Sequence, residues 1–247
     1  MSLLASQRAR RPAEILDASV QLYRMHAASF ILIAAIITLP PAVIGVFVPD
    51  AIRGVLTLIG NLLLPLGAAA TSLFIAAVMT EGEISVGESF RRIPRMGSVI
   101  GSQIVYGLAV ALSTLFFVIP GLIVAIRLAL VTPVLVIEET GIDPALKRSW
   151  ALTKGHWWHT FKTIIAGYGV GFVLFMGLAF LVGLLAGALN LPTPVVDLLT
   201  SAMFALFAPL FWIVSTLLYI DLRVRVEGAD VEAMVADLGS AASEAPA

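Results

Sequence analysis

The stretch VIGSQIVYGLAVALSTLFFVIPGLIVAIRLALVTPVLVI, residues 99–137, decides the fold of this chain. It is apolar almost throughout, and Arg127 is its only charged residue. It is too long for one transmembrane helix, because about 20 residues are enough to cross the hydrocarbon core of a bilayer. Pro120-Gly121, near its middle, is a turn dipeptide. The stretch therefore predicts two spans, 99–119 and 122–137, joined by a tight turn.

Similar apolar runs fill most of the remaining chain. The other predicted spans are residues 27–48, 55–79, 160–189 and 195–220. The chain is 60% hydrophobic and 13% charged, whereas soluble domains contain roughly 25% charged residues. Its mean hydropathy is +1.01. We therefore predict an all-α integral membrane protein whose six transmembrane helices form three hairpins.

The basic residues give the orientation of these spans. Nearly all lie in four short stretches: Arg8 to Arg24, Arg91 to Arg95, Lys147 to Lys162, and Arg223 with Arg225. Lysine and arginine concentrate in cytoplasmic loops, and six spans place all four stretches on one side. We expect both termini to be cytoplasmic. The net charge of −1 gives no reason to expect a nucleic-acid partner.

A repeated unit precedes each predicted hairpin. Leu16, Val20 and Tyr23 share one helical face, and the same spacing recurs at residues 86, 90 and 93 and at residues 146, 150 and 153. Ser19, Ser89 and Ser149 hold equivalent places in the three segments. The spacing predicts amphipathic helices in the membrane interface at about 12–26, 86–97 and 144–158.

The spacing begins a fourth time beyond the last predicted hairpin. We therefore divide the chain into a six-span membrane domain, residues 1–228, and a terminal segment, residues 229–247. The terminal segment is predicted to be a short amphipathic stretch followed by a disordered acidic tail.

Arg127 is the charge that most needs an explanation. A charge at the centre of a span costs about 2.5–3.5 kcal/mol on insertion scales, so it usually faces the helix bundle and has a partner. As a functional residue, Arg127 would bind an anion or a lipid headgroup. As a structural one, it would form a buried ion pair or extend its long side chain to the interface. Counting along the spans gives two carboxylates at a matching depth, Asp197 and Asp50, and we predict an intramembrane Arg127–Asp197 pair.

Other candidate sites are weaker. His156 and His159 lie three residues apart, but no nearby carboxylate or cysteine completes a metal site. With Trp157 and Trp158 they resemble an interfacial anchor. Small residues at 167, 171, 179, 183 and 187 form a ridge suited to close helix packing. Phosphate-loop, serine-hydrolase and zinc-protease motifs are absent from the sequence, and it contains no cysteine. We predict no catalytic residue, no metal and no cofactor.

Four segments together resemble a known family. They are Pro12–Ser19 with Leu22–Arg24, Pro120–Glu138, Ala145–Gly155, and Tyr219–Arg225 with Glu227-Gly228. The chain resembles the membrane domain that precedes some bacterial glycerophosphoryl diester phosphodiesterases and that also occurs alone. In the fused proteins, hydrolysis belongs to a separate soluble barrel. This chain ends soon after its last predicted span, so we expect no such barrel. The resemblance implies that the chain lies in the bacterial inner membrane and supplies no catalytic residues.

The sequence therefore favours a non-catalytic multi-pass membrane protein: a scaffold or accessory module that interacts with lipids or partner proteins. Its expected partners are the lipid bilayer with its anionic headgroups, a protein partner and further copies of the chain. The alternative is a transporter or channel for a small molecule or lipid, favoured by Arg127 and by the internal repeat. A membrane-embedded enzyme ranks third, because no acid, base or metal cluster occurs at one depth.

Overall fold

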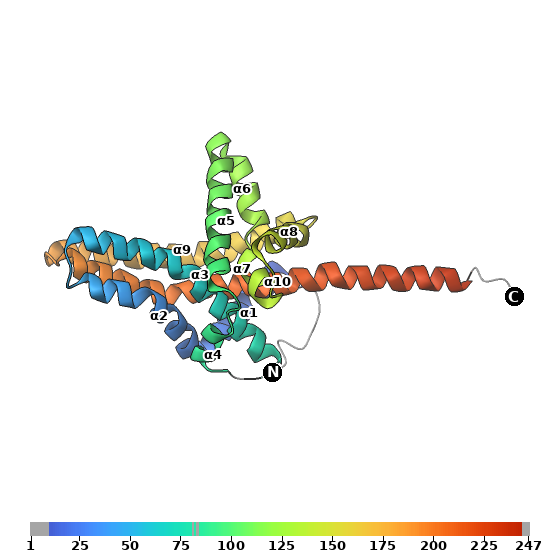
Figure 1. Ribbon diagram of the computed structural model, residues 1–247, viewed down its shortest axis with the longest axis horizontal. Coiled ribbons are helices and arrows are strands. Elements are labelled where there is room, and N and C mark those ends of the chain that lie inside the picture. Colours follow the sequence, from blue (N-terminus) through green and yellow to red (C-terminus); the bar gives the residue numbers. More distant parts are fainter. Residues whose placement is uncertain (1–9, 81, 83, 244–247) are drawn as a thin grey trace.

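The computed structural model describes residues 10–80, 82 and 84–243, and within these residues it is helical with no strand (Figure 1). The helices are α1 (Pro12–Met25), α2 (Ala27–Gly45), α3 (Asp50–Thr80), α4 (Val86–Arg91), α5 (Met96–Phe116), α6 (Val118–Arg127), α7 (Val131–Ile137), α8 (Ile142–Thr153), α9 (Trp157–Ala188) and α10 (Thr193–Ser243).

Six helical segments are long and apolar enough to cross a membrane, which confirms the predicted fold class. They are α2, α3, α5, the combined segment Val118–Ile137, α9, and α10 as far as Gly228. Each overlaps one predicted span, and the largest differences in bounds occur in α3 and α10. The chain is thus a multi-pass α-helical membrane protein.

The turn between α5 and α6 begins before Pro120. The helical backbone breaks at Phe117, which is extended, and Pro120 lies inside the first turn of α6. Proline is tolerated in a first helical turn, where its missing N–H would have no helical partner. Gly121 serves a different purpose from the one predicted, because a Cβ there would lie 2.0 Å from Thr114 Oγ1. The glycine lets α5 and α6 approach closely.

The fourth predicted span consists of two short helices. Residues 128–130 form turns between α6 and α7, and Ser149 of α8 bonds both sides of this break. Its hydroxyl donates to the Arg127 carbonyl at 2.8 Å and accepts from the Leu130 N–H at 3.3 Å. A side chain from outside the span thus replaces helical hydrogen bonds that the break removes.

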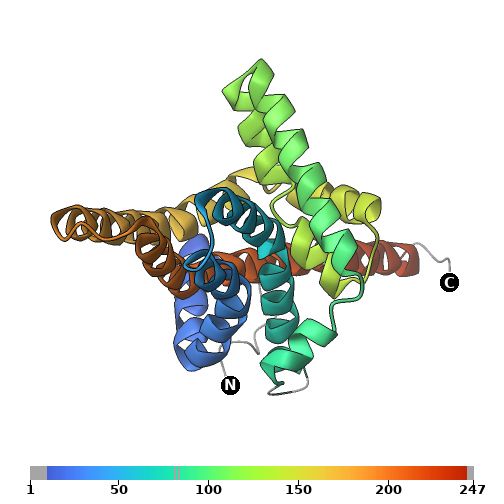
Figure 2. The same ribbon diagram turned by 60° about the vertical axis from the view of Figure 1, so that its left-hand side comes forward.

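The long helices form three pairs, of which two run side by side and the third diverges from them at a common base (Figure 1). The pairs are α2 with α3, α5 with α6, and α9 with α10, and the members of each pair are in contact. The α5–α6 pair projects away from the other two pairs in both views (Figures 1 and 2). Its tip carries five exposed apolar residues, 115–119, which suit contact with lipid tails rather than water.

The short helices connect the pairs in a cyclic order. Each packs on the pair that precedes it: α4 on α2 and α3, and α8 on α5, α6 and α7. The first helix, α1, has no preceding pair and packs on the last one, α9 and α10. We call the region where α1, α4 and α8 pack on the pairs the base. There α3, α7 and α10 contact one another, and Phe74, Val134 and Leu218 are buried.

The equivalent serines lie on the buried face of each short helix. Ser19, Ser89 and Ser149 are 1%, 0% and 0% exposed. The buried face of α1 is Ile15, Ser19 and Leu22, one position away from the apolar stripe that the spacing predicts, and Val20 of that stripe is half exposed. The difference arises because α1 packs on protein, and small serines allow that close contact.

The last helix continues beyond the membrane-spanning part. α10 runs without a break past Gly228 to Ser243 and extends away from the rest of the molecule (Figure 1). The predicted terminal segment 229–247 therefore begins as part of α10. Its last residues, 244–247, lie outside the described part of the chain.

Candidate functional site: a cavity between the helix pairs

A cavity of about 570 Å³ lies where the three helix pairs meet, and we call it the central cavity. All three pairs supply its walls. Its lining includes Asn61, Pro65 and Ser72 of α3, Gln103 and Tyr106 of α5, Leu122 and Ile126 of α6, Thr132 of α7, Ile165 and Tyr168 of α9, and Trp212 and Ser215 of α10. The cavity lies where the α5–α6 pair diverges from the other two pairs.

Polar groups in the central cavity are uncharged. Gln103 Nε2 donates to Thr132 Oγ1 at 2.7 Å, and Ser215 Oγ donates to the Ala129 carbonyl at 3.2 Å. Ser72 Oγ lies 2.9 Å from Thr216 Oγ1 on the neighbouring helix. Among the described residues that line the cavity, none is charged. Such a lining has hydrogen-bonding capacity inside the membrane without the cost of burying an ion.

The rim of the central cavity is apolar between α6 and α9. Leu122 and Ile165 both line the cavity and are 41% and 54% exposed. Exposed apolar residues in a membrane protein face lipid. The combination of a polar interior and an apolar rim suits a molecule with both kinds of surface.

A second cavity, of about 320 Å³, adjoins the first between α2, α3, α9 and α10. Asn61 and Leu64 line both cavities. The second cavity is also polar in part, with Thr57, Thr200 and Ser201 in its walls, and it includes the charged residues Arg53 and Asp197. Polar groups therefore continue from one cavity into the other past Asn61.

The structure does not join Arg127 and Asp197 in an ion pair. Arg127 is the last residue of α6, and its guanidinium lies 5.3 Å from the centre of the Trp150 ring of α8. Asp197, near the start of α10, lines the second cavity together with Arg53. The prediction placed both charges by counting along straight spans. The break after α6 and the packing of α8 over it put Arg127 beside α8 instead.

Arg53 and Arg127 contrast in their partners. Arg53 Nη1 lies 2.9 Å from Asp50 Oδ1, and its Nε donates to the Gly45 carbonyl at 3.2 Å. In Arg127, Nε and Nη1 are buried and have no hydrogen-bond partner among the described residues. The sequence identified the unusual arginine correctly but not its surroundings.

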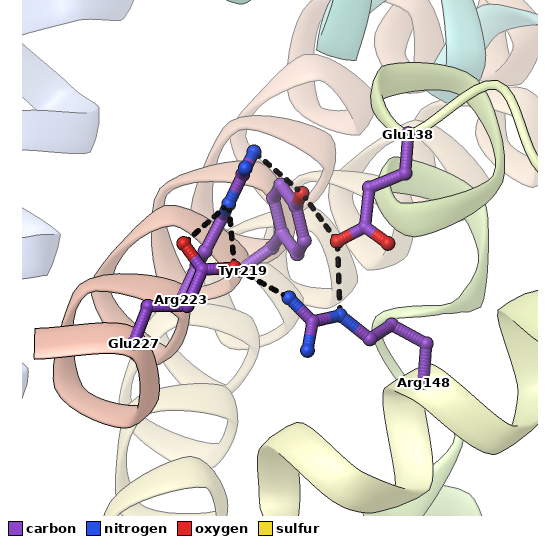
Figure 3. Close-up of polar contacts among 5 residues, drawn as sticks. All are labelled: Glu138, Arg148, Tyr219, Arg223 and Glu227. Atoms are coloured by element: carbon purple, nitrogen blue, oxygen red, sulfur yellow. Dashed lines mark hydrogen bonds and ion pairs between the residues drawn. The ribbon is translucent and has the colours of Figure 1, made fainter. Parts of the chain in front are cut away.

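Ionised groups concentrate at the base, where five residues form one network (Figure 3). Arg148 Nε donates to Glu138 Oε1 at 3.1 Å, and its Nη2 donates to Glu227 Oε1 at 2.6 Å. The Tyr219 hydroxyl donates to Glu138 at 3.0 Å, and Arg223 Nε donates to Glu227 at 3.0 Å. The network ties α8 and the end of α7 to α10.

The charge on Arg148 is secured by this network. Burial opposes it, but hydrogen bonds and attraction from Glu138 and Glu227 hold the pKa of the Arg148 guanidinium above its usual value. Two nitrogens of the group, Nε and Nη2, thus each meet a carboxylate, and the network holds α8 against α10.

A second set of ionised groups surrounds Asp221, on α10. The Asp221 side chain is 1% exposed; His159 Nε2 lies 2.9 Å from its Oδ2, and Arg225 Nε donates to the same oxygen at 2.7 Å. The backbone N–H of Arg10 donates to the other carboxylate oxygen, and Arg225 also donates to the Arg10 carbonyl. Asp221 therefore fixes the segment before α1 on the last helix pair.

His156 and His159 do not act together. His159 contacts Asp221, whereas His156 Nδ1 is buried without a partner among the described residues. Within the part of the chain that the structure describes, no three His, Asp or Glu side chains are placed to hold a metal ion.

The family model for the membrane domain of glycerophosphoryl diester phosphodiesterase matches residues 102–225. The match covers half of the chain, which therefore belongs to this family. It extends from α5 to the Asp221 and Arg223 region of α10, and so includes the second and third helix pairs. The family description concerns the membrane domain and not the catalytic one. Comparisons with curated proteins and with solved structures give no match.

Sequence reasoning missed the residues that line the central cavity. Asn61, Gln103 and Tyr168 lie in three different apolar runs, and no local motif connects these three polar residues. The one available signal was that a polar side chain in a span usually faces the helix bundle. That signal gives the inward direction but not which residues meet.

Proposed function

We propose that this protein is a non-catalytic membrane module that binds an amphiphilic lipid in its central cavity. The observation that carries the proposal is the lining of this cavity: uncharged hydrogen-bonding groups inside and exposed apolar residues at the rim. A lipid's polar part can bond to the interior while its chains leave between α6 and α9. The family match, to a membrane domain, fits a module that serves other proteins or the bilayer itself.

The volume of the central cavity also suits this ligand. Small-molecule sites occupy about 300–1,000 Å³ and combine apolar walls with a few polar groups. The cavity, at about 570 Å³, holds a headgroup with part of its glycerol backbone and leaves the acyl chains in the bilayer. A transport substrate surrounded by water would instead need a continuous aqueous lining.

Filling the cavity tests the proposal. Ala68 and Ala125 line the central cavity, so Ala68→Phe and Ala125→Phe should occupy the ligand's space. Ala111→Phe, on an exposed face of α5, is the matched control. Lipids extracted from the purified proteins are quantified by mass spectrometry. We expect both cavity variants to lose a lipid that the wild type and Ala111→Phe retain. Equal lipid content in all four proteins would refute the proposal.

Transport is the second candidate, and the shared wall of the two cavities favours it. Asn61 lines both cavities, so a ligand could pass from one to the other beside it. Asn61→Leu should then slow lipid scrambling in proteoliposomes, whereas Asn190→Leu, in the exposed α9–α10 turn, should not. Scrambling no faster than in protein-free liposomes would exclude transport and leave lipid binding.

We further propose that the base faces the cytoplasm of the bacterial inner membrane, because it carries most of the basic residues. Gly97 and Lys154 are exposed at the base, and Asn190 is exposed in the α9–α10 turn. The chain has no cysteine, so single cysteines at these positions report topology directly. An impermeant thiol reagent added outside cells should label only the Asn190→Cys protein. Labelling of the Gly97→Cys or Lys154→Cys protein would show that the base faces the outside and would contradict the proposed orientation.

A further inference from the structure

Arg127 lacks the partner that a charge in this position requires. Its Nε and Nη1 are buried and have neither a hydrogen-bond partner nor an ion pair among the described residues. The Trp150 ring centre lies 5.3 Å from the guanidinium. Stacking on an aromatic ring stabilises a cation, but it does not replace the hydrogen bonds that the two buried nitrogens lack.

The N–H groups of Arg127 have no partner in the plane of the guanidinium. The Trp150 ring covers one face of the group, whereas the five N–H donors point outward in its plane. Nε and Nη1 are buried, whereas Nη2 reaches the surface of the described part of the chain and forms no hydrogen bond there. An anion can therefore approach the Nη2 edge, whose planar donors match the oxygens of a phosphate.

A further donor without a partner lies at the start of α9. Trp157 Nε1 is buried and has no hydrogen-bond partner among the described residues. Trp157 follows Thr153 and His156 in the chain, and Thr153 joins this segment to α6: its hydroxyl contacts the Arg127 carbonyl, and its own carbonyl accepts the His156 N–H. The junction of α6, α8 and α9 thus contains unpartnered donors of Arg127 and Trp157. An anion, which carries only acceptors, is the kind of ligand that can bind them.

We propose that the junction of α6, α8 and α9 binds a phosphate group through Arg127, with the Trp150 ring supporting the guanidinium from one face. The site is separate from the central cavity. Ile126 and Leu128 face that cavity, while Arg127 between them contacts α8. The exposed indole of Trp158 nearby is typical of the membrane interface, so the phosphate of an anionic lipid headgroup is the expected source.

Native mass spectrometry with added phosphatidylglycerol tests this site, using phosphatidylcholine as the neutral lipid. The variants are Arg127→Gln and the control Lys147→Gln, whose lysine is exposed on α8 and already has Asp143 as a partner. Loss of charged hydrogen bonds should weaken phosphatidylglycerol binding about tenfold in Arg127→Gln. Lys147→Gln should bind as the wild type does. Unchanged binding in Arg127→Gln, or equal loss in both variants, would overturn the proposal.

Inorganic phosphate distinguishes the two sources of the ligand. If phosphate at constant ionic strength raises the melting temperature of the wild type but not of Arg127→Gln, the site takes free phosphate. If only phosphatidylglycerol does so, the site takes a lipid headgroup. If Arg127→Gln does not fold, Arg127→Lys decides, because lysine keeps the charge without the planar fork. Its binding should weaken severalfold, and wild-type affinity in that variant would contradict the proposal.

Discussion

At the base, α10 places Tyr219 and Asp221 against charged partners, whereas in the central cavity Gln103 and Ser215 meet only uncharged groups. Both regions join elements far apart in the sequence. The network at the base is closed, because Arg148, Tyr219 and Arg223 all donate to the carboxylates of Glu138 and Glu227 (Figure 3). The cavity is open, with polar groups facing unfilled space. The difference indicates that ionised groups hold the units together and uncharged groups are left for a ligand.

The largest expected effect is at Asp221. Asp221→Asn removes the charge that Arg225 and His159 face, and losing one partner of a buried pair costs about 3–5 kcal/mol. We expect a clear drop in the melting temperature in detergent, followed by circular dichroism. Asp197→Asn is the control, because Asp197 lines the second cavity and forms no ion pair among the described residues. Similar losses in both variants would remove the distinction between base and cavity.

A smaller loss is expected at Glu138. Glu138→Gln weakens the bonds to Arg148 and Tyr219, but Glu138 and Arg148 are only partly buried, so we expect about 1–2 kcal/mol. Hydrogen exchange should increase in α8, which the network ties to α10, more than in α4. A uniform increase across the chain would show that Glu138 does not hold α8 specifically.

Glycines of α9 should differ along the helix. A Cβ at Gly171 would lie 2.8 Å from the Phe211 ring, whereas nothing lies within 4 Å of one at Gly183. Overpacking costs about 1–3 kcal/mol, so Gly171→Val should lower the melting temperature and Gly183→Val should not. The predicted small-residue ridge therefore packs only in its first half. Equal effects of the two substitutions would restore the full ridge.

The smallest effect is at Glu88, on the exposed surface of α4. Hydrogen bonds from Arg92 and Arg91 hold the pKa of the Glu88 carboxyl below its ordinary value of 4.5. A lowered folded-state pKa stabilises the ionised form above the unfolded value, and this stabilisation is lost as the pH falls through the folded value. The protection of the α4 amides against exchange, relative to an unstructured chain at the same pH, should therefore fall below about pH 4.5 in the wild type. Glu88→Gln should lack that fall.

The sequence predicts the six spans because hydrophobic length is a local property. Ser19, Ser89 and Ser149 also reveal a repeat, and all three prove to be buried. The cyclic packing could not be predicted, because contact of α1 with α9 and α10 joins opposite ends of the chain. The place of Arg127 was missed for a similar reason: the break after α6 is held by Ser149, which is distant in the sequence.

The central claim is that a lipid occupies the central cavity, and Trp212 in its wall reports this directly. In a variant with Trp150, Trp157 and Trp158 changed to Phe, Trp212 is the only tryptophan. Its fluorescence is measured in nanodiscs with and without brominated lipid, before and after Ala125→Phe fills the cavity. The account predicts strong quenching that Ala125→Phe largely removes. Quenching of the same size in both proteins would contradict it.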